Sequence, residues 1–108
     1  MLYSIVYSTE EVKKNRREIV KMQRKVQSLQ KALAELGPVM RGSVVVIGMK
    51  SKQPYFSLTK DKKTRLIYLG KDRVEKAQEY SQNYKRLLAI VEEMTVLNME
   101  LLKLDAAP

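Results

Sequence analysis

The sequence predicts an α+β protein, in which a long antiparallel, coiled-coil-like helical hairpin carries a three-stranded antiparallel β-meander between its two helices. Two long segments place apolar residues at alternating intervals of three and four, which is typical of coiled-coil helices. Between them, residues 41–71 hold three short runs rich in β-branched and aromatic residues, separated by turn residues. A chain of 108 residues suits a single domain with one modest core, so residues 1–108 are predicted to form one domain.

The composition excludes several classes of protein. The chain has no cysteine and no histidine, which removes disulfides and leaves a zinc site almost no ligands. No apolar run approaches the roughly 20 residues that cross a bilayer, and the first residues lack the basic start and cleavage site of a signal peptide. We therefore expect a cytoplasmic protein with no membrane partner, no metal and no cofactor.

The first helix is predicted over residues 8–36, preceded by a short strand or ordered arm at residues 1–7. Residues 2–7 alternate in the period-2 pattern of a strand, although a flexible terminus fits them equally well. Ser8 and Glu11 have the spacing of a capping box, and Gly37 with Pro38 ends the helix. The apolar seam consists of Val12, Ile19, Met22, Val26, Leu29, Leu33 and Leu36, with the polar Asn15 completing the series.

The second helix is predicted over residues 72–104, with Asp72 and Glu75 at the capping-box spacing. Its seam is predicted to consist of Ala77, Tyr80, Tyr84, Leu87, Val91, Met94, Asn98 and Leu101. Leu88, Met99 and Leu102 widen the apolar stripe beyond what one partner helix covers. The meander or a second copy of the chain would cover the excess, so we expect a homo-oligomer. Pairing of the seams between chains rather than within one remains open.

The two polar seam residues suggest a register for the hairpin. If Asn15 faces Asn98, every other seam residue of the first helix also finds a seam partner, as in Val26 with Leu87. A buried Asn pair can fix the register of a coiled coil at some cost in stability. On this hypothesis, Asn15→Leu would raise thermal stability while loosening the register or the oligomeric state.

The meander is predicted to contain strands at Ser43–Met49, Tyr55–Lys60 and Thr64–Leu69. The turn between the second and third strands leaves their register open. A two- or four-residue loop pairs Phe56 with Ile67, whereas a three-residue loop pairs Phe56 with Tyr68.

Most of the net charge of +9 lies in the middle of the chain. Residues 41–73 carry nine Lys/Arg and two Asp/Glu, whereas residues 74–108 carry four and six. The cations at the strand ends and turns are Arg41, Lys50, Lys52, Lys60, Lys62, Lys63 and Arg65. Such side chains reach phosphates, and a two-stranded ribbon fits the major groove of DNA. Protection of the sheet edges by lysine is an equally weighted alternative.

Two tyrosines of the meander also have two interpretations. Tyr55 and Tyr68 either stack on bases or pack as half-buried side chains, and packing is the favoured interpretation. Tyr55 nevertheless joins the cations in the predicted nucleic-acid-binding set.

The sequence contains no catalytic constellation. A Ser or Thr nucleophile would lack a histidine base, and the acids of the middle segment, Asp61 and Asp72, have no acidic neighbour with which to hold Mg²⁺. No Gly-rich phosphate loop is present. We therefore expect neither an enzyme nor a small-molecule substrate.

Several short motifs resemble a known family. They are Gly42-Ser43, Pro54-Tyr55-Phe56-Ser57-Leu58-Thr59, Lys63-Thr64-Arg65, Tyr68-Leu69, Asn83-Tyr84-Lys85-Arg86-Leu87, Glu92-Glu93-Met94 and Leu97-Asn98. Over residues 15–104 the chain resembles a small family of uncharacterised bacterial and archaeal domains, often encoded beside or within transposase genes. Members carry a Cys-rich, knuckle-like loop and a His-Gly-Pro-Tyr run between the first two strands. Here that loop is reduced to residues 50–53 and contains neither Cys nor His, so the resemblance implies no metal ligands. It does imply a helix–meander–helix fold and a function related to DNA.

The function predicted from the sequence is non-catalytic nucleic-acid binding, most readily of duplex DNA, by a basic meander that the helices hold in place. The alternative is a protein–protein adaptor that uses the coiled-coil surface, with the basic charge serving solubility.

Overall fold

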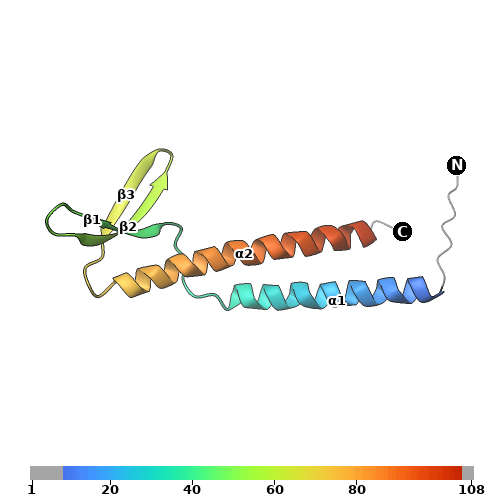
Figure 1. Ribbon diagram of the computed structural model, residues 1–108. Helices are drawn as coiled ribbons and strands as arrows, with labels where there is room; N and C mark the ends of the chain where they lie inside the picture. Colours follow the sequence, from blue (N-terminus) through green and yellow to red (C-terminus); the bar gives the residue numbers. More distant parts are fainter. Residues whose placement is uncertain (1–8, 106–108) are drawn as a thin grey trace. The chain divides into compact units, whose positions relative to one another are not determined.

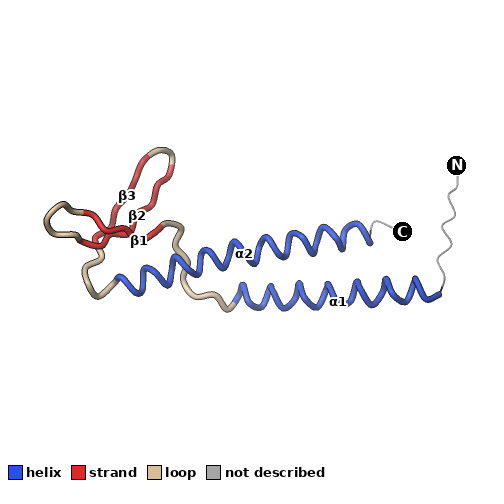
Figure 2. Tube along the Cα trace, in the orientation of Figure 1, coloured by secondary structure: helices blue, strands red, loops and turns tan. Residues whose placement is uncertain are grey.

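A computed structural model describes residues 9–105, and the predicted residues 1–7 and the cap at Ser8 lie outside this range. The order of elements is helix, three strands, helix, which confirms the α+β class (Figures 1 and 2). The elements are α1 (Thr9–Ala34), β1 (Ser43–Ile47), β2 (Gln53–Lys60), β3 (Lys63–Tyr68) and α2 (Val74–Asp105). Neither helix contains an apolar stretch that would span a bilayer.

The chain divides into two compact units, and the single domain over residues 1–108 stays a prediction. The helical unit combines α1 with the part of α2 from Ile90 onward, and the sheet unit comprises residues 35–89. The helix α2 therefore contributes its first half to one unit and its second half to the other. The sheet unit has a core of its own, to which the first half of α2 contributes Ala77.

In the helical unit, α1 buries the face that its sequence predicts. Val26 is buried, and Ile19, Met22, Leu29 and Leu33 are half-buried, while most of the residues between them are exposed. The spacing of three and four places these side chains on one side of a helix with 3.6 residues per turn. The antiparallel hairpin is also observed. Lys25 Nζ lies 3.2 Å from Glu93 Oε1 on α2, and Gln23, earlier in α1, lines a hollow with Leu101, later in α2.

The seam of α2 differs from its prediction at two positions. Ile90 is buried and Leu97 is half-buried, whereas Val91 is 47% exposed and Asn98 is exposed. The observed seam has Ile90 in place of Val91 and Leu97 in place of Asn98, one residue earlier in each case. The helical spacing is kept, and a leucine takes the place of a polar residue. Burying Leu97 instead of an amide avoids the desolvation of an unpaired polar group, which explains the preference.

The register also differs from the one predicted from the two asparagines. That register places Lys25 opposite Leu88, five residues from its observed partner Glu93. Asn98 lines a hollow together with Ile19 and Gln23, and Asn15 is exposed. The two exposed amides therefore do not form a buried pair, and the expected gain in stability from Asn15→Leu loses its physical basis.

The sheet has the order β1-β2-β3 with antiparallel pairing throughout. Phe56 pairs with Ile67, which selects the register with a two-residue loop. Both loop residues, Asp61 and Lys62, have positive φ angles of 53° and 63°. This is the type I′ turn, whose twist matches that of the strands it joins.

The core of the sheet unit lies between one face of the sheet and the first half of α2. Phe56, Leu69 and Ala77 are buried together, and Met40, Val44 and Val74 pack against them. The segment before β1 is tied to α2 by three hydrogen bonds: Met40 N donates to Tyr80 O, Ser81 Oγ to Gly42 O, and Asn83 Nδ2 to Pro38 O. These bonds fix the entry of the chain into β1.

Candidate nucleic-acid interface

The β2–β3 hairpin brings several of the predicted cations together. Lys60 and Lys63 lie directly opposite each other at its end, and Lys62 occupies the turn. Arg65 lies two residues further along β3, opposite Leu58. Because like charges in directly opposed positions destabilise a sheet, this arrangement favours an anion that neutralises them.

Arg41 joins the same group from the segment before β1. Its guanidinium Nη1 donates a hydrogen bond of 3.1 Å to the carbonyl oxygen of Thr59, one residue from the end of β2. Five of the seven predicted cations therefore form one group, which we call the hairpin cluster: Arg41, Lys60, Lys62, Lys63 and Arg65. All five side chains are exposed.

Lys50 and Lys52 do not belong to this group. Both lie in the loop between β1 and β2, and both are exposed. Successive antiparallel strands are joined at alternate ends of a sheet, so this loop and the β2–β3 turn lie at opposite ends of β2. The sequence could not separate the two groups, because it lists all seven cations within 25 residues.

Tyr55 lies on the other face of the sheet from the hairpin cluster. Side chains alternate along a strand, so Tyr55 points away from the side that carries Phe56, Leu58 and Lys60. Its ring packs edge to face with that of Tyr68, with centroids 5.5 Å apart, and Tyr68 Oη donates to Gln53 Oε1. These contacts give Tyr55 a packing role within the sheet.

Little negative charge lies near the hairpin cluster. Asp61 in the turn is the acid closest in sequence, and the ion pairs found within residues 9–105, Lys25–Glu93 and Lys103–Glu100, lie on the helices. The positive charge of the cluster is therefore not balanced by the ion pairs of the described chain.

An apolar groove adjoins the cluster, and sequence reasoning missed it. It has a volume of about 460 Å³ and is lined by Met40, Arg41, Phe56, Leu58, Arg65, Leu66 and Ile67. The signal available in the sequence was that every second residue of 56–60 and of 63–67 is apolar or basic, apolar at the end far from the turn and basic at the end next to it. Reading that signal required the strand register, which the sequence left open.

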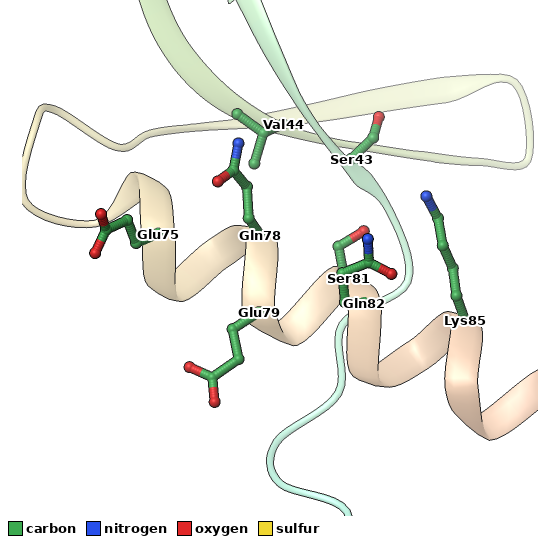
Figure 3. A pocket seen from close by; sticks show the side chains of 8 residues that line it. All are labelled: Ser43, Val44, Glu75, Gln78, Glu79, Ser81, Gln82 and Lys85. Carbon is green, nitrogen blue, oxygen red and sulfur yellow. The ribbon is translucent and has the colours of Figure 1, made fainter.

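A second hollow, of about 510 Å³, has a different character (Figure 3). It lies between β1 and the first half of α2, where Glu75, Glu79 and Lys85 mix both signs of charge. Its buried serine hydroxyl, Ser81 Oγ, is already bonded to Gly42 O. In the part of the chain that the structure describes, no group of three or more Asp and Glu side chains is placed to hold a metal ion.

An exposed apolar stripe runs along the second half of α2. Val91, Met99 and Leu102 share one side of the helix and are 47–69% exposed. The polar residue among them, Thr95, donates its hydroxyl to Val91 O at 2.7 Å, so its donor is satisfied within the helix. We call these four residues the α2 stripe.

No family model, curated protein or solved structure matches this chain. The resemblance of its motifs to domains encoded with transposases therefore stays a prediction.

Proposed function

We propose that this protein is a non-catalytic, cytoplasmic nucleic-acid-binding protein whose hairpin cluster contacts phosphates. The observation that carries the proposal is the gathering of five exposed cations at one hairpin with little acid beside them: Lys60, Lys62, Lys63 and Arg65 on the hairpin itself, and Arg41 bonded to it through Thr59 O. Guanidinium and ammonium groups are the main protein partners of nucleic-acid phosphates. Duplex DNA, whose major groove accepts a two-stranded ribbon, is the partner that the sequence favours.

Binding through the hairpin cluster predicts a steep dependence on salt. Each phosphate neutralised on duplex DNA contributes about −0.9 to the slope of log K against log salt concentration, so five contacts give about −4.5. Fluorescence anisotropy with a labelled duplex between roughly 50 and 200 mM salt measures this slope. Absence of binding to DNA and RNA even at low salt would refute the proposal.

Charge reversal locates the contacts. Lys62→Glu with Lys63→Glu should weaken binding and reduce the steepness of the slope by about 2. The matched control is Lys21→Glu with Lys31→Glu, which changes the net charge equally on exposed positions of α1. If the control weakens binding as much as the hairpin variant does, net charge and not the hairpin cluster is responsible.

A protein–protein adaptor is the second candidate, and the α2 stripe favours it. Apolar side chains aligned on one side of a helix and left exposed are the usual mark of a helix–helix interface. A second copy of the chain is the partner we propose, because self-association through the stripe supports either function. Met99→Gln with Leu102→Gln should then lower the mass in solution from dimer to monomer at micromolar concentration, with helix content unchanged. If the parent protein is a monomer in solution, self-association through the α2 stripe is refuted.

A further inference from the structure

The apolar groove beside the hairpin cluster has the form of a binding site. Its floor consists of Met40, Phe56, Leu58 and Ile67, and its volume of about 460 Å³ falls in the range of small-ligand sites. A smaller hollow of about 200 Å³ shares Met40, Phe56 and Ile67 with it and extends it along the sheet unit.

The rim of the groove is positively charged. Arg41 and Arg65 line the groove itself, and Arg73 and Lys76 line the adjoining hollow. No Asp or Glu is among the described residues that line either part. The hydrogen bond from Arg41 to Thr59 O holds that guanidinium in place before a ligand arrives, which reduces the entropy lost on binding.

Groove and hairpin cluster lie on the same face of the sheet. By alternation and register, Phe56, Leu58 and Lys60 on β2 share this face with Ile67, Arg65 and Lys63 on β3. Each strand therefore leads from an apolar side chain in the groove to a lysine at the end of the hairpin. An elongated anion can contact both.

We propose that the groove binds the unpaired bases of a single-stranded nucleic acid. This inference rests on the proposed function and narrows its partner. Bases released from a duplex expose flat apolar faces, which lie on the floor or stack on the guanidinium planes of Arg41 and Arg65. The phosphates of the same strand lie on the arginines and on the lysines of the hairpin end.

The chemistry of the groove favours this occupant over the duplex that the sequence suggests. In a duplex the bases are stacked and paired inside the phosphate backbone. A bound duplex would therefore leave the apolar groove of about 460 Å³ without a base in it. An acidic peptide would satisfy the charges of the rim, but its Asp and Glu side chains have no aromatic face to lie on the apolar floor or against the guanidinium planes.

The test compares three labelled probes of about ten nucleotides, a length within the range that one small single-strand-binding domain covers. They are a single strand, the same strand with abasic sites in its central half, and the corresponding duplex, all at one salt concentration. We expect the intact single strand to bind about tenfold more tightly than the abasic strand, which keeps every phosphate but lacks the central bases. A polyglutamate of equal charge should fail to displace the single strand at matched concentration.

Two variants place the effect in the groove. Ile67→Thr keeps a β-branched residue on the strand but removes apolar floor, and Arg65→Lys keeps the charge but removes the planar guanidinium. Each should weaken single-strand binding several-fold. Ile67→Thr should leave abasic-strand binding unchanged, because Ile67 contacts no phosphate. Arg65→Lys should weaken binding of the intact strand more than binding of the abasic strand, because Arg65 also contacts phosphate. Val46→Thr is the matched control, because Val46 is exposed on the same face of the sheet but on β1, outside the groove. Circular dichroism and the melting temperature check that each variant is folded.

The outcomes separate this inference from the proposed function. Equal affinity for intact and abasic strands, tighter binding of the duplex, or displacement by polyglutamate would overturn the groove as a base site while leaving phosphate binding by the hairpin cluster intact. Failure of all three probes to bind at low salt would overturn both.

Discussion

At the scale of single residues, the turn that presents the hairpin cluster is strained. A type I′ turn needs positive φ at both central positions, which Gly and Asn adopt readily, but here Asp61 and Lys62 occupy them. Lysine in the left-handed region costs about 1 kcal/mol relative to its usual conformations. A cation is thus kept at a position where glycine would be more stable, which agrees with a role for its charge.

Replacing the turn lysine should reveal this conflict between stability and binding. Lys62→Gly is expected to raise the free energy of unfolding by about 0.5–1 kcal/mol, because glycine adopts positive φ without strain. Chemical denaturation measures the gain, and the anisotropy assay should show weaker binding by the same variant. Lys63→Gly is the control, since glycine inside β3 should lower stability instead.

Gly42 is the residue at which a single methyl group should matter most. Its φ is 140°, and an added Cβ would lie 2.6 Å from Ser57 O and 2.7 Å from the Phe56 ring. Gly42→Ala should therefore destabilise the sheet unit by roughly 2 kcal/mol or more, through backbone strain and displacement of a buried ring. The comparison is Gly37→Ala, where the nearest atom is the side-chain Nδ2 of Asn83 at 3.2 Å and φ is not in the left-handed range. Equal effects of the two changes in thermal melting would contradict this account.

At the scale of elements, the observed seam of α2 differs from the predicted one in phase, that is, in which side of the helix is buried. Both seams obey helical spacing, so periodicity alone does not choose between Leu97 and Asn98. The choice follows from packing: α1 presents Val26 and its neighbours to the side of α2 that carries Ile90 and Leu97 in the helical unit. The helix α2 contributes buried residues to two units, and the spacing of its apolar residues does not by itself say which side is buried in each.

Truncation of the two neighbouring residues tests this phase. Leu97→Ala should lower the free energy of unfolding by about 1.5–2 kcal/mol, less than for a fully buried leucine because Leu97 is half-buried. Asn98→Ala and Asn15→Leu change exposed side chains and should stay within about 0.5 kcal/mol of the parent protein. If urea denaturation showed a larger loss of stability for Asn98→Ala or Asn15→Leu than for Leu97→Ala, the asparagine pair would again be the feature that sets the register.

At the scale of the whole molecule, a net charge of +9 on 108 residues acts against the folded state through self-repulsion. Much of this charge is concentrated at the hairpin cluster, so screening or binding of anions should stabilise the protein. The melting temperature is expected to rise between about 20 and 200 mM salt, where the screening length shortens from roughly 20 to 7 Å. Sulfate should act more strongly than chloride at equal ionic strength, and a melting temperature that falls with salt would contradict the argument.

The sequence by itself determined the types and order of the elements, the buried face of α1 and the concentration of positive charge in the meander. These features depend on local spacing and composition, which a chain carries whatever it packs against. Only the tertiary structure decided that Phe56 pairs with Ile67, that Leu97 rather than Asn98 enters the seam, and that Tyr55 lies on the face opposite the hairpin cluster. The physical reason is that alternation fixes side chains relative to their own strand or helix alone. A shift of one residue in the β2–β3 pairing would have preserved every local pattern and removed the groove between Arg41 and Arg65.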